Sequence, residues 1–351
     1  MRIAQVAPLY ESVPPQLYGG TERVVSYLTE ELVRLGHEVT LFASGDSTTS
    51  ARLIPACERA LRLDDRCRDH LAHQVLMLEE VAKRAASFDV IHYHIDYFHY
   101  PLSRRQTVPQ VTTLHGRLDL PELAPLYLEF REMPVVSISD AQRAPLPHAG
   151  WVETVHHGLP RDLLRFSPGP GRYLAFVGRA SPEKRLDRAI EIARLAGMEL
   201  WVAAKVDAVE AAYFRERLAP MIEPPQTEFV GEVDDEGKNA LLGGARALLV
   251  PIDWPEPFGL VMIEAMACGT PVIAWDRGSV REVVDDGVTG FVVGSLDEAL
   301  AALRRIDALD RHRIRRVFEH RFAARTMARN YVHVYQRLLS RQRRPPVTLV
   351  R

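Results

Sequence analysis

Short apolar segments alternate along the chain with longer segments in which apolar residues recur at helical spacing. Residues 3–8, IAQVAP, form the first apolar run, and a segment of helical periodicity follows, with Thr21 as the expected N-cap and Gly36 as its end. Residues 38–44, EVTLFAS, form the next run. Short runs that are apolar throughout are typical of parallel strands covered on both faces. This order predicts an α/β protein with doubly wound parallel sheets.

The same alternation begins again after a short segment rich in glycine and proline. Residues 167–172, SPGPGR, have the composition of a hinge, and residues 173–178, YLAFVG, form a further buried strand. A length of 351 residues is sufficient for two hydrophobic cores. We therefore predict one domain over residues 1–166, a second over residues 167–321 and a C-terminal segment over residues 322–351.

A pair of glycines, Gly19 and Gly20, lies in the loop between the first strand and the first helix. Such loops open at the carboxyl edge of a parallel sheet, where folds of this kind bind ligands. The pair lacks the GxGxxG pattern of dinucleotide-binding folds, which removes most of the support for a dehydrogenase. An ordinary tight loop is the alternative, since glycine is common in turns.

The segment from Asp253 to Val283, DWPEPFGLVMIEAMACGTPVIAWDRGSVREV, combines a rigid loop, a helix and two spaced carboxylates. Its prolines exclude regular structure around Glu256, and the apolar residues after Gly259 predict a helix. The amides of Phe258, Gly259 and Leu260 would then face outward at the start of this helix. Together with the positive end of the helix dipole, such amides suit phosphate or hydroxyl oxygens of a ligand.

Glu256 and Glu264 are spaced so that they could contact opposite ends of one extended ligand. Five residues of helix rise about 7 Å, and the loop adds to this separation. The two carboxylates are therefore too far apart to act as one acid–base pair, and we expect Glu264 to bind a ribose and Glu256 a hexose. The alternative is structural, with Glu256 as a helix cap and Glu264 as an exposed helix charge.

Two cations, Arg179 and Lys184, follow the strand at residues 173–178. A helix is predicted to begin between these two cations, with Ser181 as its N-cap and Pro182 as its first residue. Cations beside a helix amino terminus, at the carboxyl edge of a strand, would neutralise a diphosphate and the charge that a leaving group develops. Ordinary solvent-facing side chains are the alternative.

His115 ends another apolar strand, residues 110–116, and is therefore expected at a ligand-binding edge. There it could meet sugar hydroxyls or the reacting centre, whereas a histidine packed and bonded locally is the alternative. His92 and His94 project to the same face of an earlier strand. Together with His99 and His115 they could suggest a metal, but no carboxylate or cysteine completes a ligand set at a readable spacing.

The residues from Glu256 to Glu264 resemble the Glu-seven-residues-Glu motif of the retaining family-four glycosyltransferases, within EPFGLVMIEAMACGTPVIA. YGGTERVV resembles the amino-terminal glycine loop of that family, and FVGRASPEKR resembles its Gly-Arg and Lys pair. The resemblance covers nearly the whole chain and is strongest from Tyr173 to Val293. It implies the GT-B fold, in which two Rossmann-like domains face each other across a cleft and the last helix crosses back to the first domain.

The resemblance also implies a reaction, the transfer of a hexose from a nucleoside-diphosphate sugar to an acceptor hydroxyl with retained anomeric configuration. UDP-glucose is the expected donor, and no cofactor or metal is expected. His115 and Glu256 are implied as catalytic residues. The residues implied in donor binding are Gly19, Gly20, Arg179, Lys184, Gly231, Val233, Phe258, Gly259, Leu260 and Glu264.

Two other classes of function remain open. One is another GT-B enzyme, such as a phosphorylase or an epimerase, although a pyridoxal-dependent phosphorylase normally has a far longer chain and a non-hydrolysing epimerase lacks the EPFG pattern. The other is a non-catalytic module that binds nucleotide sugars, against which the presence of Arg179, Lys184 and Glu256 counts. Residues 1–165 do not distinguish a small-molecule acceptor from a polysaccharide or a lipid-linked saccharide.

Composition changes this picture little. A net charge of -2 with 47% hydrophobic residues implies no bulk attraction to nucleic acid or to membranes. Residues 50–87 are predicted to be helical, and their interleaved arginine and acidic residues favour a solvated face over a patch for a membrane surface or an anionic acceptor. A weak peripheral membrane contact remains an alternative. No apolar run has the length of a membrane span, no signal peptide is recognised, and the three cysteines lack metal-ligand spacing, so we expect a cytoplasmic protein.

Overall fold

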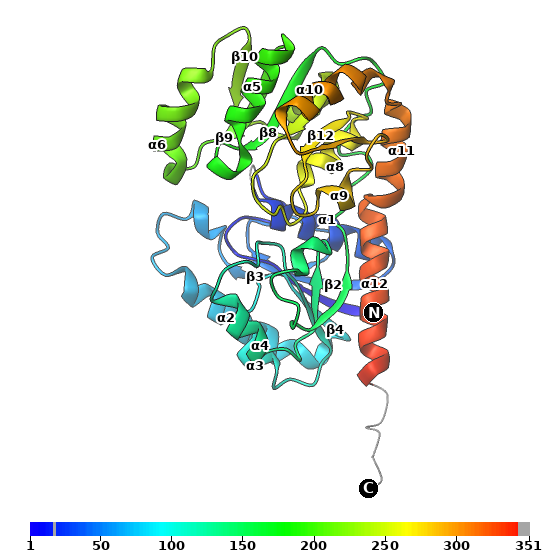
Figure 1. Ribbon diagram of the computed structural model, residues 1–351. Helices are drawn as coiled ribbons and strands as arrows, with labels where there is room; N and C mark the ends of the chain where they lie inside the picture. The colour runs from blue at the N-terminus through cyan, green and yellow to red at the C-terminus, as the bar shows by residue number, and fades with distance from the viewer. Residues whose placement is uncertain (17–18, 343–351) are drawn as a thin grey trace. The chain divides into compact units, whose positions relative to one another are not determined.

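The computed structural model describes residues 1–16 and 19–342, which form two compact units (Figure 1). Unit 1 contains Met1–Ile138, Arg143–Gly158 and the segment that begins at Ala324, and unit 2 contains Ser139–Gln142 and Leu159–Ala323. Tyr18 of the predicted glycine loop and the last nine residues of the predicted C-terminal segment, 343–351, lie outside the described residues.

The contacts divide the chain after Gly158 and before Ala324, whereas the sequence places its boundaries at 166/167 and 321/322. Arg315 accounts for the first difference, because its guanidinium donates hydrogen bonds to the carbonyl oxygens of Arg161, at 2.6 Å, and Leu164, at 3.0 Å. Residues 159–166 are thereby attached to unit 2.

Each unit is built on one parallel sheet, as predicted. The strand order is β3-β2-β1-β4-β5-β6-β7 in unit 1 and β10-β9-β8-β11-β12-β13 in unit 2. The strands of unit 1 are β1 Arg2–Val6, β2 Glu38–Ser44, β3 Arg52–Cys57, β4 Val90–Tyr93, β5 Gln110–Thr113, β6 Val135–Ser137 and β7 Trp151–Thr154. Those of unit 2 are β8 Tyr173–Arg179, β9 Leu200–Lys205, β10 Thr227–Gly231, β11 Ala245–Val250, β12 Val272–Trp275 and β13 Gly290–Val293.

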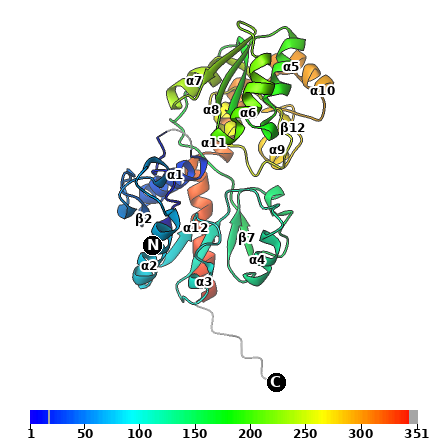
Figure 2. The same cartoon turned by 90° about the vertical axis from the view of Figure 1, so that its left-hand side faces the viewer.

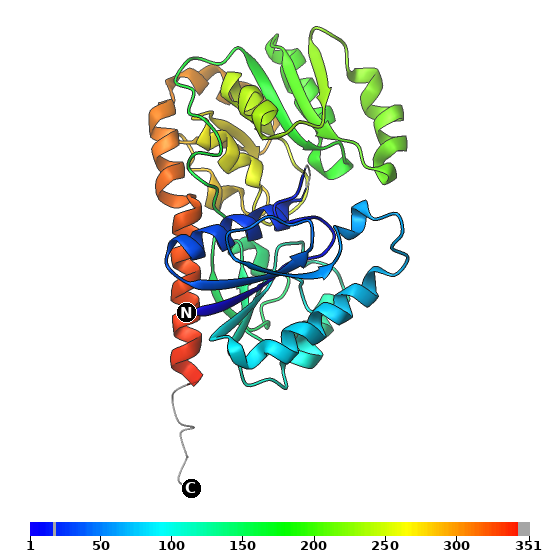
Figure 3. The same cartoon turned by 180° about the vertical axis from the view of Figure 1, so that it is seen from behind.

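Helices cover both sheets. In unit 1 they are α1 Gly20–Arg34, α2 His70–Arg84, α3 Tyr100–Ser103, α4 Leu123–Glu129 and α12 Ala324–Gln342. In unit 2 they are α5 Leu186–Ala196, α6 Ala211–Tyr213, α7 Asp235–Gly244, α8 Leu260–Ala267, α9 Val280–Val283, α10 Leu296–Arg305 and α11 Arg311–Arg321. In unit 2, α5 packs beside α10 (Figure 2), and in unit 1, α1 packs beside α12 (Figure 3).

The strand order of each sheet reverses direction at one place, between β1 and β4 in unit 1 and between β8 and β11 in unit 2. Open α/β sheets bind ligands just beyond the carboxyl ends of the strands at such a reversal. Residues that follow β1 and β4, or β8 and β11, are therefore placed where each sheet can receive a ligand.

The prediction of a helix over residues 50–87 is wrong for the part that precedes His70. Arg52–Cys57 forms β3, which pairs only with β2 at the edge of the sheet, and the helix α2 begins at His70. An edge strand tolerates Pro55, which lacks a backbone donor. Asp69 fixes the start of α2, since its carboxylate accepts hydrogen bonds from the amides of Leu71 and Ala72.

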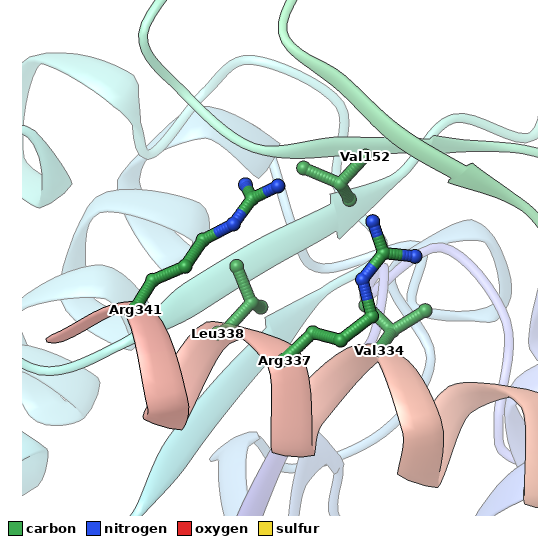
Figure 4. Close-up of a pocket in the computed structure, with 5 residues that line it drawn as sticks. All are labelled: Val152, Val334, Arg337, Leu338 and Arg341. Carbon is green, nitrogen blue, oxygen red and sulfur yellow. The ribbon is translucent and has the colours of Figure 1, made fainter. Parts of the chain in front are cut away.

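At the other edge of unit 1, α12 packs on β7. Figure 4 shows Arg337 and Arg341 reaching from α12 toward the strand that carries Val152. The pocket between them, also lined by Val334 and Leu338, has an empty volume of about 180 Å³ with open solvent included. Arg337 closes one side by an ion pair with Glu153 at 2.5 Å. We interpret this pocket as imperfect helix packing.

Across the described ranges, none of the helices is both long and apolar enough to cross a membrane.

Candidate functional site

Glu256 lies in the loop between β11 and α8, on one side of the strand-order reversal of unit 2, and is 8% exposed. Its Oε2 atom accepts a hydrogen bond from the ammonium of Lys184 and another from Trp254 Nε1, at 3.1 Å. The Lys184 ammonium also lies 4.9 Å from the centroid of the Trp254 ring. The predicted alternative of a helix cap does not apply, because Gly259 is the N-cap residue of α8 and no side chain caps this helix.

Lys184 follows β8, on the other side of the same reversal. The helix predicted to begin at Ser181 is instead a single 3-10 turn, Pro182–Lys184, and α5 begins only at Leu186. Arg185 lies between the 3-10 turn and α5, and its backbone is in the left-handed region, with φ 55°. This turn brings the ammonium of Lys184 to the carboxylate of Glu256. The sequence pattern places Lys184 in the first turn of a helix and does not predict this contact.

Gly278 holds the backbone of Glu256 in place. Its φ is 56°, and a Cβ atom added there would lie 2.3 Å from the carbonyl oxygen and 2.4 Å from the amide nitrogen of Glu256. The next residue, Ser279, donates its amide to the same carbonyl at 2.9 Å and its hydroxyl to the carbonyl of Phe258 at 2.9 Å. Sequence reasoning missed Gly278, although the run DRGS is a recognisable turn signal.

The start of α8 presents the amides predicted for ligand binding. Phe258 is buried, and Gly259, with φ 81°, begins the turn into the helix at Leu260. The first residues of a helix have no intrahelical acceptor for their N–H groups. Gly259 and Leu260 are partly exposed, so this end of α8 can meet a ligand oxygen.

Glu264 lies in the second turn of α8 and is 5% exposed, so the alternative of an exposed helix charge is wrong. Its Oε1 atom accepts a hydrogen bond from the ammonium of Lys238 on α7, at 2.8 Å. The sequence pattern does not identify Lys238 as a partner of Glu264, because the two residues are 26 positions apart and no local pattern links them.

Arg179 ends β8, as predicted, but its guanidinium already has acidic partners. It lies 2.8 Å from Glu183, 3.3 Å from Glu210 and 4.0 Å from Asp207. Arg179 is therefore held by carboxylates, and a diphosphate would have to compete with them. The Arg179 side chain is 29% exposed, so it is partly open to solvent as well as paired with these carboxylates.

Gly231 and Val233 lie at the carboxyl end of β10, on the edge of the sheet of unit 2. Gly231 has φ 76°, which turns the chain toward α7. Asp234 caps that helix by accepting a hydrogen bond from the amide of Gly237 at 2.8 Å. The two predicted residues are thus part of a capped turn that is separated from β8 by β9.

In unit 1, Gly19 and Gly20 stand at the start of α1. Gly19 is the N-cap residue and Gly20 the first helical residue, so Thr21 is not the N-cap. A Cβ atom at Gly19 would lie 2.8 Å from Pro15 Cβ and 3.2 Å from the Glu22 carboxylate. Burial raises the pKa of Glu22 above its ordinary value. The glycine loop is therefore closely packed at this position.

His115 follows β5, and its ring joins a cluster of buried histidines in unit 1. His115 Nε2 lies 2.9 Å from His94 Nδ1, and His94 Nε2 lies 2.7 Å from Gln5 Oε1. The His115 ring also stacks on His157, with centroids 5.2 Å apart. Burial lowers the pKa of His115 to about 3, and that of His94 lies well below its ordinary value. Both rings are therefore neutral near pH 7.

His92 and His99 use their ring nitrogens for hydrogen bonds to hydroxyl groups. His92 contacts Tyr335 and Thr113, both at 2.7 Å, and His99 contacts Ser103 at 2.8 Å and Thr112 at 2.7 Å. Among residues 1–16 and 19–342, no group of three histidine, cysteine, aspartate or glutamate side chains is placed to hold a metal ion.

The predicted residues thus fall into separate groups. In unit 2, Lys184 and Glu256 meet at the strand-order reversal beside the start of α8, whereas Glu264 pairs with Lys238. In unit 1, His115 belongs to the histidine cluster at the carboxyl ends of β4 and β5.

Two family models of glycosyltransferases match the chain. Residues 165–318 match the family model described as "Glycosyl transferases group 1", and residues 18–180 match the one described as "Glycosyltransferase Family 4". The crystal structure of AviGT4, a glycosyltransferase involved in avilamycin A biosynthesis, is 26% identical with a TM-score of 0.74, over 97% of this chain and 98% of that one. Sucrose-phosphate synthase from Thermosynechococcus elongatus shares the fold, at 20% identity and a TM-score of 0.78 over 97% of this chain and all of that one.

Curated relatives include two phosphatidyl-myo-inositol mannosyltransferases. The one from Mycobacterium leprae is 33% identical over 154 residues, which cover 40% of each chain, so the chain matches less than half the length of that relative. The one from Mycolicibacterium smegmatis is 26% identical over 96% of this chain and 94% of its own.

The two parallel sheets and these matches define a glycosyltransferase with the GT-B fold. Within that class, the chain belongs to the family-four glycosyltransferases.

Proposed function

We propose that this enzyme transfers a hexose from a nucleoside-diphosphate sugar to an acceptor hydroxyl with retention of the anomeric configuration. The observation that carries the proposal is the pairing of Lys184 with Glu256 where the strand order of unit 2 reverses. A cation and a carboxylate at this edge, beside the partly exposed start of α8, provide charges of both signs for a diphosphate and a sugar.

The donor would lie along the carboxyl edge of unit 2. Lys184, Arg179 and the first amides of α8, at Phe258, Gly259 and Leu260, would bind the diphosphate. Glu264 would accept hydrogen bonds from the ribose hydroxyls, with Lys238 holding its carboxylate in place. Gly231 and Val233 would contact the base. For unit 1, we propose that Gly19 and Gly20 contact phosphate and that His115 contacts the sugar.

In the proposed reaction, the bond from the anomeric carbon to the leaving phosphate oxygen breaks, and a bond to the acceptor oxygen forms on the same face. The acceptor proton passes to the leaving phosphate, so no protein base is consumed. A retaining hydrolase places two carboxyls about 5 Å apart, whereas the Glu256 carboxylate accepts hydrogen bonds from an ammonium and an indole N–H. Glu256 would position the sugar and stabilise the positive charge that develops on it.

We further propose that no metal or cofactor is required. Lys184, Arg179 and the amides of α8 would together offset the charge that develops on the leaving diphosphate. The expected result is that activity persists in excess EDTA.

UDP-glucose is the first donor to test, and GDP-mannose is the second, because the M. leprae and M. smegmatis relatives are named mannosyltransferases. The acceptor remains open, since the names of relatives include both phosphatidyl-myo-inositol and D-inositol 3-phosphate as substrates. A small hydroxylated molecule, a polysaccharide and a lipid-linked saccharide each belong in the acceptor screen.

The test is nucleotide release from UDP-glucose, GDP-mannose, UDP-N-acetylglucosamine and ADP-glucose in EDTA, with each acceptor class and without acceptor. Glu256→Gln and Lys184→Met should each reduce release from the preferred donor at least about a hundredfold. Arg281→Gln is the matched control, since it removes an exposed ion pair with Asp276 in the same unit. NMR of the product would read its anomeric configuration, and an inverted product would contradict retention.

Binding without turnover across the whole panel would instead favour the non-catalytic module. Formation of a sugar phosphate from a polysaccharide and phosphate would favour a phosphorylase, and interconversion of two donors would favour an epimerase. If no donor is hydrolysed and none raises the thermal midpoint, the transferase proposal fails for these donors.

A further inference from the structure

A continuous chain of hydrogen bonds links α12 to His115 through the interior of unit 1. Tyr335 Oη contacts Gln5 Nε2 at 3.1 Å, and Gln5 Oε1 contacts His94 Nε2 at 2.7 Å. His94 Nδ1 in turn contacts His115 Nε2 at 2.9 Å. Gln5 and Tyr335 are fully buried and His94 is 3% exposed, so solvent does not compete for these bonds. We call these four residues the Tyr335–His115 relay.

The Gln5 amide gives the relay a direction. Its Nε2 atom donates to Tyr335 and its Oε1 atom accepts from His94, so His94 carries its proton on Nε2. The Nδ1 atom of a neutral His94 is then an acceptor, and His115 must donate to it from Nε2. His115 therefore has its lone pair on Nδ1.

A second branch agrees with this direction. Tyr335 Oη, having accepted from Gln5, donates its own proton to His92 Nδ1 at 2.7 Å. His92 then donates from Nε2 to Thr113 Oγ1 at 2.7 Å, and Thr113 Oγ1 also shares a hydrogen bond with Tyr331 Oη at 2.8 Å. All three histidines thus carry the proton on Nε2, which is the more stable tautomer of a neutral histidine side chain.

The Nδ1 atom of His115 is left without a hydrogen-bond partner among the residues that the structure describes, although it is buried. Buried polar atoms are nearly always satisfied, and those that are not often mark a functional site. His115 as a whole residue is only partly buried, so a ligand can approach its ring with a small adjustment of its surroundings.

We propose that Gln5, His94 and Tyr335 are positioning residues that fix His115 as the Nε2–H tautomer, so that its Nδ1 atom accepts a hydrogen bond from a sugar hydroxyl. This inference rests on the proposed function, because the hydroxyl belongs to the hexose that is transferred. It makes His115 a recognition group for an O–H donor and excludes it as a general acid, since Nδ1 carries no proton to give.

Specificity follows from this polarity. A hydroxyl can donate to Nδ1, whereas hydrogen, fluorine and a methyl ether at the same carbon cannot. The site would therefore reject the deoxy, fluoro and methoxy analogues to a similar degree. If His115 donated from Nδ1 instead, the methoxy oxygen could still accept and the three analogues would differ.

The first experiment reads the tautomers directly, by two-dimensional NMR of the full chain labelled with 15N histidine at pH 7.5, with His115→Gln and His94→Gln assigning the signals. We expect a protonated Nε2 and an unprotonated Nδ1 for both rings. The reverse pattern at His115 would overturn the proposal. This readout needs no substrate, so it stands even if the proposed transferase function fails.

Variants then test whether the relay sets this state. Tyr335→Phe and Gln5→Met should mix the two tautomers of His115 and lower kcat/KM about tenfold, with thermal midpoints recorded to exclude unfolding. Tyr331→Phe is the matched control on the same helix, because Tyr331 contacts Thr113 and not Gln5. We expect it to leave the His115 signals unchanged. Tautomers that are unaffected by Tyr335→Phe and Gln5→Met would contradict the positioning role.

The last arm uses donor analogues in which each hexose hydroxyl in turn is replaced by hydrogen, fluorine or methoxy. At one position we expect all three replacements to lower kcat/KM about tenfold or more in the native protein and little further in His115→Gln. If every position is equally sensitive in both proteins, His115 does not recognise a hydroxyl. In that case the tautomer could still be fixed, and the transferase could still be active.

Discussion

The ammonium of Lys184 is bonded to the carboxylate of Glu256, although 72 positions separate them in the chain. Lys184 follows β8 and Glu256 follows β11, the two strands that flank the strand-order reversal of unit 2. Trp254 touches both partners, since its N–H donates to Glu256 and its ring lies under the Lys184 ammonium. This three-residue arrangement is the best-defined part of the proposed donor site.

Trp254→Phe should lower kcat/KM about five- to tenfold. The substitution keeps an aromatic face under Lys184 but removes the hydrogen bond to Glu256, which contributes about 1 kcal/mol. Trp254→Leu removes both and should be more damaging. Steady-state kinetics with the preferred donor would check this, and equal activities of the native protein and Trp254→Phe would show that the indole N–H does not position Glu256.

Gly278→Ala should abolish most activity because the new Cβ atom would collide with the backbone of Glu256. We expect kcat to fall at least about a hundredfold, since displacements near 1 Å at a catalytic group have effects of this size. Gly287→Ala is a matched control, with φ 73° but no atom within 4 Å of the new Cβ. It should lower the thermal midpoint with little effect on kcat. Similar kcat values for the two variants would contradict the role of Gly278.

Acid should destabilise unit 1 through its buried histidines. Burial lowers the pKa of His99 to about 3, against 6.5 in the unfolded chain. Between these values the unfolded state binds a proton that the folded state does not, so stability rises with pH in this window and is lost as the pH falls below about 6.5.

At pH 5, His99 alone should cost about 2 kcal/mol relative to pH 8. His99→Gln should flatten the dependence of the unfolding free energy on pH, which urea titrations at pH 5 to 8 would measure. If the unfolding free energy of His99→Gln depended on pH as steeply as that of the native protein, His99 would not contribute to the loss of stability in acid.

Arg311→Lys should lower the free energy of unfolding of unit 2 by about 2–3 kcal/mol. The guanidinium donates to the carbonyl oxygens of Ser167, at 2.9 Å, Ala245, at 3.0 Å, and Gly243, at 3.3 Å, and to Thr270 Oγ1 at 2.6 Å. An ammonium cannot reach four such acceptors. Arg316→Lys, at an exposed position of the same helix, is the control for thermal unfolding. Equal midpoints for the two variants would contradict this account.

Much of the fold could be predicted from local patterns. The apolar runs identified the parallel strands, and the proline-rich loop around Glu256 and the helix after Gly259 were correctly placed, because their signals lie within a few residues. The strand at Arg52–Cys57 is missed although residues 53–57, LIPAC, are apolar, because Pro55 lacks the amide that a central strand needs and the charged residues that follow favour a helical interpretation. The start of α5 was placed too early because Ser181 and Pro182 also suit a 3-10 turn.

The partners of the site residues could not be predicted in the same way. Nothing near Glu264 in the sequence indicates Lys238, and nothing near His115 indicates Gln5 or Tyr335. These pairs form only when strands and helices far apart in the chain are packed together. A motif thus identified the carboxylates and the histidine, but their protonation and orientation depend on tertiary contacts.

The bond between Gln5 and Tyr335 spans 330 positions, and it joins the first strand to the last helix of the same unit. During synthesis, the sheet of unit 1 leaves the ribosome long before α12 does, whereas unit 2 is translated in between as a nearly continuous stretch. Domains generally fold as units as they emerge. Unit 2 can therefore complete its core first, and unit 1, although its sheet is made before unit 2, must wait until α12 is translated to bury Gln5 and its histidines.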